Sequence, residues 1–168
     1  MRKNALMLAV AGTLLIASGT AGAATKTTTF GVSAVVNPNC LVSATALAFG
    51  GYDGTAAKTG TSDITVRCST GTTYAVSLST GGGTFAQRLL SAGGTNKLQY
   101  NLFTTLAATT IWGDGIAVGT GTVPGTGAGM AAGSANTLTV FGQLPDNAFN
   151  QGAPSGSYND TITVTVTY

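Results

Sequence analysis

Apolar and polar residues alternate with a period of two along several stretches of this chain, a pattern typical of β-strands that bury one face. The clearest stretch lies at the end of the sequence. Its even positions carry Ile162, Val164, Val166 and Tyr168, and its odd positions carry Thr161, Thr163, Thr165 and Thr167. We therefore predict a strand over 161–168 whose even side chains face a core.

A second alternating stretch lies near the beginning of the sequence. Its even positions carry Thr28, Phe30, Val32, Ala34 and Val36. The sequence Asn37-Pro38-Asn39 then ends the pattern, because proline lacks a backbone donor and asparagine favours turns. The pattern predicts a strand over 28–36 with one buried face.

Shorter stretches between these two ends show the same period. They lie at 64–68, 74–78, 98–102 and 138–141. Glycine-rich turn clusters at 50–54 and 81–83 separate some of them, and no long window keeps apolar residues at helical spacing. Short strands at such intervals predict an all-β, immunoglobulin-like sandwich.

The stretch 113–136 is rich in glycine, threonine and alanine and offers few large side chains for burial. We predict a mobile or loosely packed surface excursion there. A phosphate-binding loop is the alternative, but no lysine follows the glycines. We expect Trp112 in the core or at its edge. Asp53, Asp114 and Asp160 are expected in turns, because their spacing does not resemble a calcium-binding loop.

The first residues have the composition of a secretory signal peptide. Arg2 and Lys3 precede an apolar stretch over 5–16, and small residues follow at 21–24. The apolar stretch is too short for a membrane-spanning helix, which needs about 20 residues. We expect cleavage after Ala23, which assigns 1–23 to the signal peptide and leaves the length of one domain.

The composition restricts the chemistry that the chain can perform. It contains no histidine and no glutamate, so the usual general base, the common zinc ligand and paired carboxylates are nearly all lacking. Serine and threonine hydroxyls have no positioned base to activate them. We expect no enzymatic activity, no catalytic residues, no metal site and no cofactor.

The charge of the chain restricts its partners. Once Arg2 and Lys3 are removed, five basic and five acidic residues remain, and the net charge is zero. A neutral surface exerts no long-range attraction on nucleic acid or on an anionic membrane, and it favours self-association. The expected partners are therefore other copies or relatives.

Cys40 and Cys68 are the two cysteines of the chain. An even pair in an exported protein predicts one disulfide, and two free thiols are the alternative. Closing a loop of about 29 residues contributes roughly 3.5 kcal/mol in the chain-entropy model.

The alternating stretches at the two ends of the chain suggest a function together. Since the sequence ends with 161–168, we expect the sandwich to lack the strand that would normally lie beside this one. The edge left open would expose unpaired backbone groups and an apolar slot. A chain with a spare strand at the front and a vacancy at the back can polymerise head to tail, and such contacts build filaments because they do not close.

An ordered set of short motifs extends over essentially the whole mature chain. The motifs are Phe30-x-Val32-x-Ala34, Asn39-Cys40, Leu47-x-Phe49-Gly50-x-Tyr52, Ile64-x-Val66-x-Cys68, Tyr74-x-Val76-x-Leu78, Leu98-x-Tyr100, Trp112-Gly113-Asp114 and Gly156-x-Tyr158-x-Asp160-Thr161-x-Thr163-Val164. This set resembles the spore coat protein U domain family, which includes the major subunits of archaic chaperone-usher pili.

The resemblance implies a pilin-like sandwich over 37–168 that lacks its final strand and is completed by a donor strand from another subunit. The implied donor segment is 24–36, with Thr28, Phe30, Val32, Ala34 and Val36 on its inward face. The implied acceptor groove is lined by Ile162, Val164, Val166 and Tyr168. Within the family the paired cysteines match Cys40 and Cys68.

The resemblance also implies the partners and the location of the protein. It implies binding to a periplasmic chaperone, export through an outer-membrane usher, and a surface fibre of homologous subunits that does not insert into the membrane.

Three functions are open at this point. The leading interpretation is a shaft subunit of an adhesive or biofilm-forming pilus, because the single-domain length and the spare strand distinguish the chain from a tip adhesin. A spore or cell coat protein assembled by the same mechanism is the second. A monomeric secreted binding module is the third, and it predicts a complete fold.

Overall fold

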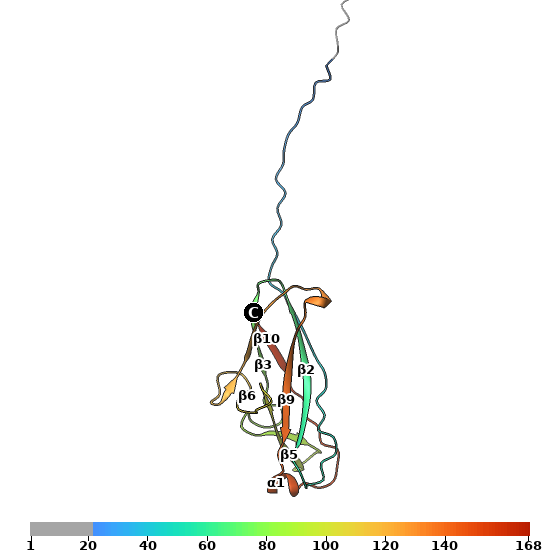
Figure 1. The fold of residues 1–168 in the computed structure, drawn as a ribbon, viewed down its shortest axis with the longest axis vertical. Helices are drawn as coiled ribbons and strands as arrows, with labels where there is room; N and C mark the ends of the chain where they lie inside the picture. The colour runs from blue at the N-terminus through green and yellow to red at the C-terminus, as the bar shows by residue number, and fades with distance from the viewer. Residues whose placement is uncertain (1–21) are drawn as a thin grey trace, which may run out of the picture. The chain divides into compact units, whose positions relative to one another are not determined.

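The computed structural model describes residues 22–168, so the predicted signal peptide over 1–23 lies outside the described residues except for its last two positions. Residues 36–168 form one compact unit whose regular secondary structure is almost entirely β-strand (Figure 1). The all-β prediction is thereby confirmed.

The larger of two sheets has seven strands in the order β1-β2-β9-β5-β6-β7, with β4 paired to β5 beside that path. Its strands are β1 (Cys40–Ala44), β2 (Lys58–Cys68), β4 (Arg88–Ser91), β5 (Lys97–Phe103), β6 (Ile111–Trp112), β7 (Thr120–Gly121) and β9 (Asn136–Leu144). All pairs in it are antiparallel except β6 with β7.

The smaller sheet has three strands in the order β10-β3-β8, all antiparallel. They are β3 (Thr73–Leu78), β8 (Val123–Thr126) and β10 (Val164–Thr167). Two short helical turns complete the unit, η1 (Ala132–Ser134) and α1 (Ala148–Gln151).

The core lies where the inward faces of the two sheets meet. Alternate residues of β2, β3 and β5 are buried, which follows from their period-two sequence. Trp112 is buried as expected, and its indole Nε1 donates a hydrogen bond to the Val76 carbonyl at 2.9 Å. This bond ties the larger sheet to the smaller one.

The strands predicted over 64–68, 74–78, 98–102 and 138–141 all form, within β2, β3, β5 and β9. Of the predicted strand over 161–168, only Val164–Thr167 forms a strand, β10. A hydrogen bond from the Ser79 amide to the Thr163 carbonyl extends its pairing with β3 by one residue beyond the ladder. The predicted strand over 28–36 is not formed, and residues 22–39 belong to no strand of the described structure.

The prediction of a mobile or loosely packed excursion over 113–136 is wrong. This stretch contains β7, β8 and η1, and β8 is a full member of the smaller sheet. Asp114 organises its first turn, because one carboxylate oxygen accepts hydrogen bonds from the Ile116 and Ala117 amides, both at 2.9 Å. These bonds also hold the pKa of Asp114 below its usual value. Hydrogen bonding and close glycine packing replace large side chains here.

Candidate functional site

Two strands, β1 and β10, occupy the outer edges of the two sheets on the same side of the sandwich. β1 is the first strand of the larger sheet, and β10 is the first strand of the smaller sheet. The two lie in contact, although within residues 22–168 no ladder pairs one with the other. Each of these two edges therefore leaves backbone groups without a strand partner on its outer side.

The side chains along these two edges point toward the core but remain uncovered. Val42 of β1 lies opposite Val66, and the two share a face of the sheet. Val66 is fully buried, whereas Val42 is 44% exposed. Val164 and Val166 of β10 lie opposite the buried residues Leu78 and Val76 but are only partly buried themselves.

A cavity of about 420 Å³ separates the continuations of the two edge strands. Residues 44–49, which follow β1, line one wall, and residues 159–162 with Val164 line the other. Buried apolar side chains such as Ile64, Leu102 and Val140 form the floor. We call this cavity the groove.

The groove also contains a carboxylate, Asp160, which is hydrogen-bonded by donors of the same domain. It accepts hydrogen bonds from the Tyr100 hydroxyl at 2.6 Å and from the amides of Gly82 at 3.0 Å and Thr161 at 2.7 Å. Burial, followed by the bond to Asp160, raises the pKa of Tyr100 well above its usual value. Because these partners already satisfy the carboxylate, the groove suits an apolar ligand rather than a cation.

The four residues predicted to line the acceptor lie along this edge, but they are not equivalent. Ile162 and Val164 line the groove. Val166 lies further along β10, beyond the lining, and Tyr168 is 58% exposed. The sequence reasoning missed the opposite wall over 44–49, where Leu47 and Phe49 alternate like a strand but are interrupted by neighbouring alanine and glycine.

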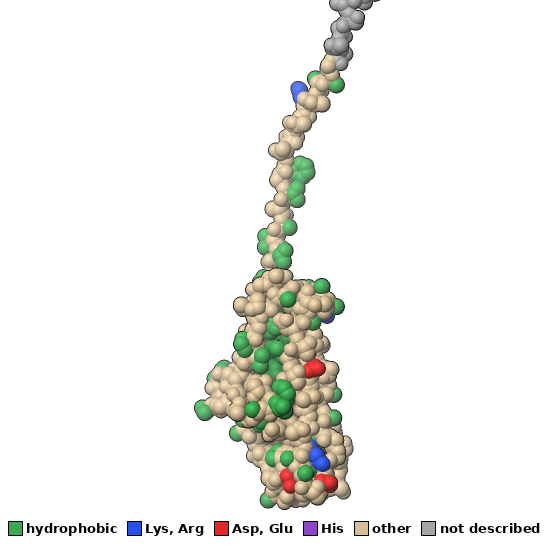
Figure 2. Space-filling view, in the orientation of Figure 1, with side chains coloured by type: hydrophobic (Ala, Val, Ile, Leu, Met, Phe, Trp, Pro, Cys, Tyr) green, Lys and Arg blue, Asp and Glu red, His purple; other side chains and the backbone are tan. Residues whose placement is uncertain are grey.

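The residues predicted to form the donor face are all exposed in the described chain. Thr28, Phe30, Val32, Ala34 and Val36 contact no core, and Phe30 is 86% exposed. Figure 2 shows hydrophobic side chains set at intervals along this uncovered segment.

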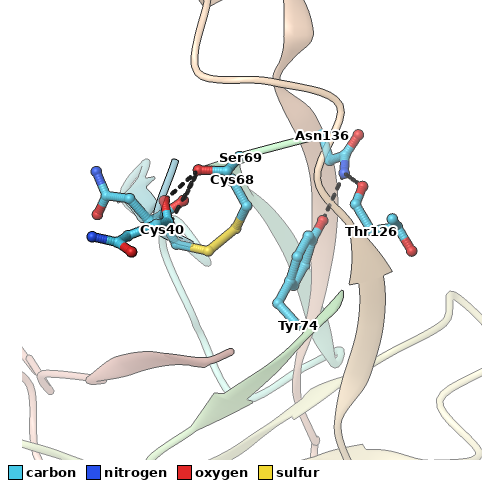
Figure 3. Close-up of a disulfide and its surroundings, with 8 residues drawn as sticks. Cys40, Cys68, Ser69, Tyr74, Thr126 and Asn136 are labelled. Carbon is cyan, nitrogen blue, oxygen red and sulfur yellow. Dashed lines mark hydrogen bonds between the residues drawn. A yellow bond between two sulfur atoms is a disulfide. The ribbon is translucent and has the colours of Figure 1, made fainter. Parts of the chain in front are cut away.

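The predicted disulfide between Cys40 and Cys68 is confirmed and joins β1 to β2 (Figure 3). Beside it, the Ser69 amide donates a hydrogen bond to the Asn39 carbonyl at 2.9 Å. Nearby, the Asn136 side-chain amide donates to the Tyr74 hydroxyl at 2.8 Å and to the Thr126 carbonyl at 2.9 Å. The disulfide and the Ser69 bond hold the start of β1 against the end of β2, and the Asn136 bonds tie β9 to β3 and β8.

Other kinds of site find little support in the part of the chain that the structure describes. Within residues 22–168 no three acidic, cysteine or histidine side chains gather as a metal site would require. The described helices are also too short or too polar to cross a membrane.

Known proteins resemble this chain over most of its length. The family model described as Spore Coat Protein U domain matches residues 26–165. Protein U of Myxococcus xanthus is 31% identical over 185 aligned residues, which cover 99% of this chain and 98% of that protein.

A solved structure shares the fold. It is the pre-assembly complex of the chaperone CsuC with the tip adhesion subunit CsuE, from the archaic chaperone-usher Csu pili of Acinetobacter baumannii, matched with a TM-score of 0.54 and 27% identity. The match covers 79% of this chain but 40% of the matched chain, so this chain spans less than half of that chain's length. The family match and this shared fold lead to one conclusion: the protein belongs to the Spore Coat Protein U domain family and has the fold of a chaperone-usher pilus subunit.

Proposed function

We propose that the protein is a structural subunit of a surface fibre, and that copies join when the exposed segment of one enters the groove of the next. The observation that carries the proposal is the groove itself, which lies beside two sheet edges without an outer strand partner and is lined by partly buried Ile162 and Val164. Strand addition to an open sheet edge is an established mode of recognition in chaperone and pilin assemblies.

The chain supplies a segment with the properties that the groove requires. Segment 24–36 is free of strand pairing, carries apolar side chains at every second position from Phe30, and is exposed. Burying Phe30, Val32 and Val36 contributes roughly 5 to 8 kcal/mol as an upper value. The alternation places these side chains on one face, while Gly31, Ser33 and Val35 face away.

Assembly in this way requires protection of the groove before fibre growth. An exposed edge with an apolar floor aggregates unless another strand covers it. We therefore propose that a periplasmic chaperone covers the groove and that an outer-membrane usher exports the subunits. The division of the chain is then 1–23 as signal peptide, 24–36 as donor segment and 37–168 as acceptor domain.

We propose a role in the shaft of a pilus that supports adhesion or biofilm formation. A shaft subunit must both give and receive a strand, and this chain carries one donor segment and one groove. The role is structural rather than enzymatic, because the groove presents apolar walls and a carboxylate that is already hydrogen-bonded.

A coat protein assembled by the same exchange is a second candidate. The description of the matching family, Spore Coat Protein U domain, favours it. Electron microscopy of the producing cells separates the two candidates, because a pilus extends as thin fibres while a coat forms a layer.

Substitutions in the exposed segment test the proposal directly. We expect Phe30→Asp to abolish multimers that resist dissociation in detergent, because a carboxylate in an apolar groove costs several kcal/mol. Ser33→Asp is the matched control and should keep the multimers, because its side chain faces away from the groove. Deletion of 24–36 should leave a chain that co-purifies with the chaperone and stops fibre growth.

Two results would contradict the proposed function. One is retention of the multimers after deletion of 24–36. The other is equal loss of multimers in Phe30→Asp and Ser33→Asp, since the proposal predicts a difference between the two faces of the segment.

A further inference from the structure

A second cavity of about 690 Å³ continues the groove beyond the end of the strands. The two cavities share Leu47, Phe49, Leu90 and Asn159 in their linings, so one leads into the other. The walls of the second cavity are two loops, 47–54 and 153–159, and its floor includes buried Leu98 and Leu144. We call it the loop cavity.

Specific hydrogen bonds hold the walls of the loop cavity in place. The Tyr52 hydroxyl donates to an Asp146 carboxylate oxygen at 2.7 Å, and the Tyr158 hydroxyl donates to the Pro154 carbonyl at 2.7 Å. In the floor, buried Asn150 donates to the carbonyls of Gln99 at 2.9 Å and Pro145 at 2.7 Å. The cavity is therefore a built feature of the domain.

The chemistry of the loop cavity differs from that of the groove. The amide and carbonyl of Asn159 both bond to Ser91, at 3.0 and 2.8 Å, so this residue has no backbone group left for another strand. Exposed Ser155 and Ser157 and the two tyrosine rings line the remainder. A ligand that binds as a β-strand in the groove can no longer pair with the sheet at this point. Beyond it, the ligand contacts polar loops and aromatic rings.

The direction of the donor follows from the two ends of the groove. At one end β1 and β10 contact each other, and the lining of the groove runs from Ala44 and Val164 away from that contact toward the loop cavity. The C-terminal end of the donor segment continues into the donor's own domain at Cys40. This end must therefore leave the groove at the loop cavity, where there is space for the following residues. The donor segment then runs antiparallel to β10.

We propose that Asn37 and Pro38 of a second copy occupy the loop cavity, so that each joint extends past the donor strand into a linker-binding site. This inference rests on the proposed function, because it places the linker where an inserted donor strand would end. The joint then holds the two domains through the loops as well as through the groove.

The register of an antiparallel donor decides whether the linker reaches the loop cavity. Residues directly opposite one another share a face, so inward Val36 lies opposite an inward residue such as Ile162, Asp160 or Tyr158. Opposite Ile162, Val36 would leave Asn37 and Pro38 in the groove, opposite 161 and 160. Opposite Asp160 the linker falls at 159 and 158, and opposite Tyr158 at 157 and 156, so the proposed occupant requires one of these two registers.

The residue types of the linker match the cavity. Proline has no amide hydrogen and cannot extend a ladder, which agrees with the loss of free backbone groups at Asn159. Its ring can pack against the aromatic faces of Tyr52 and Tyr158, while the Asn37 amide can bond to the serine hydroxyls of the cavity.

A photo-reactive side chain tests the inference in the assembled fibre. With p-benzoylphenylalanine in place of Ser157, we expect irradiation to cross-link one copy to residues 36–39 of another, as identified by peptide mass spectrometry. The same probe in place of Ala107, in the exposed turn between β5 and β6, should give no cross-link to this segment.

The outcomes distinguish this inference from the proposed function. Cross-links to residues 24–29 would overturn the direction, and intact multimers without any cross-link from position 157 would overturn the occupant. In both cases the proposed function would stand. Absence of multimers from the unsubstituted protein would overturn the proposed function and the inference with it.

A substitution that fills the loop cavity provides a second measurement. A Cβ atom at Gly156 would lie 3.5 Å from the Ala92 Cβ and 3.7 Å from the Tyr158 ring, which are ordinary contact distances, so a side chain can start here without forcing the backbone. We expect multimers of Gly156→Trp to dissociate at a lower temperature than those of the unsubstituted chain, and those of Ala107→Trp to be unchanged. Equal dissociation temperatures for Gly156→Trp and the unsubstituted chain would contradict the linker-binding site.

Discussion

Two regions of the sandwich differ in how completely their side chains are buried. In the region around Trp112 and Arg88, which we call the closed side, both side chains are buried and hydrogen-bonded. On the open side, between β1 and β10, Val42 is 44% exposed although the valine opposite it is fully buried. The domain therefore covers its core completely around Trp112 and Arg88 but leaves apolar side chains of β1 and β10 partly exposed.

Arg88 shows how the closed side is held together. Its guanidinium donates to the Ser79 carbonyl at 2.8 and 3.1 Å, to the Trp112 carbonyl at 2.7 Å and to the Asn101 side chain at 2.6 Å. It also lies over the Phe85 ring, 5.4 Å from the centroid. Burial lowers the pKa of Arg88, but an arginine side chain stays protonated. The Arg88 side chain thus links the segments that contain Ser79, Asn101 and Trp112.

The largest expected effect concerns the open side. Val164→Asp places a carboxylate on the face of β10 that lines the groove, and we expect multimers to be lost. Thr165→Asp is the matched control on the same strand, because Thr165 is exposed and faces away from the core. Gel analysis of surface material in detergent measures both. Normal multimers in Val164→Asp would show that this edge of β10 does not receive a strand.

The next largest effect concerns the closed side. Arg88→Met removes the donors to the buried Ser79 and Trp112 carbonyls, and each unpaired acceptor costs about 1 to 3 kcal/mol. We expect a loss of about 4 kcal/mol in the free energy of unfolding, from the same argument. Urea unfolding of the chain without 24–36 measures it free of polymerisation.

The control for this variant is Arg67→Met. Arg67 lies on β2, is only partly buried and is not among the hydrogen-bond partners of Arg88, so its replacement should change stability by no more than about 0.5 kcal/mol. Equal losses for the two variants would show that the Arg88 hydrogen bonds do not hold the closed side.

The contrast between the two sides explains what the sequence could predict. The central strands β2, β3, β5 and β9 have strict alternation because both flanking strands and the facing sheet constrain them, and their cores were recognised. The strand β10 was predicted from the alternation of its threonine and valine residues, although it lies at a sheet edge and only Val164–Thr167 forms the strand. The disulfide followed from the presence of only two cysteines.

The remaining features depend on contacts between residues distant in sequence. Strands β4, β6, β7 and β8 have only two to four residues, too few for a period to be visible. The burial of Arg88 depends on carbonyls 9 and 24 residues away. The second groove wall continues beyond Ala44, the last residue of β1, over 45–49, which belongs to no strand and alternates only in part, so pattern alone did not identify it.

A smaller effect should come from the disulfide, which anchors β1 at the open side. Replacing Cys40 and Cys68 with serine releases a loop of about 29 residues, and the chain-entropy model gives a loss of about 3.5 kcal/mol. The chain without 24–36 should show this loss in urea unfolding. Addition of a reductant to the unsubstituted chain is the control and should produce the same shift, whereas no shift in either experiment would mean that β1 is held by its pairing with β2 alone.

The smallest expected effect concerns Tyr52, on the wall of the loop cavity. Partial burial and the hydrogen bond to Asp146 raise the pKa of Tyr52 from 10.0 to about 12. Because the folded chain holds this proton more tightly than the unfolded chain, the stabilisation is fully present below pH 10 and is lost as the pH rises through about 12. Ultraviolet titration of the unsubstituted chain against Tyr52→Phe isolates this phenol, and stability measured between these pH values should fall less in Tyr52→Phe. Asp146→Asn should move the pKa of Tyr52 only part of the way back toward 10.0, since burial remains the largest cause of the shift. A titration of Tyr52 at its ordinary pKa would show that the hydrogen bond does not hold this wall in solution, and the loop cavity would then lose one of the contacts that keep it open for the linker.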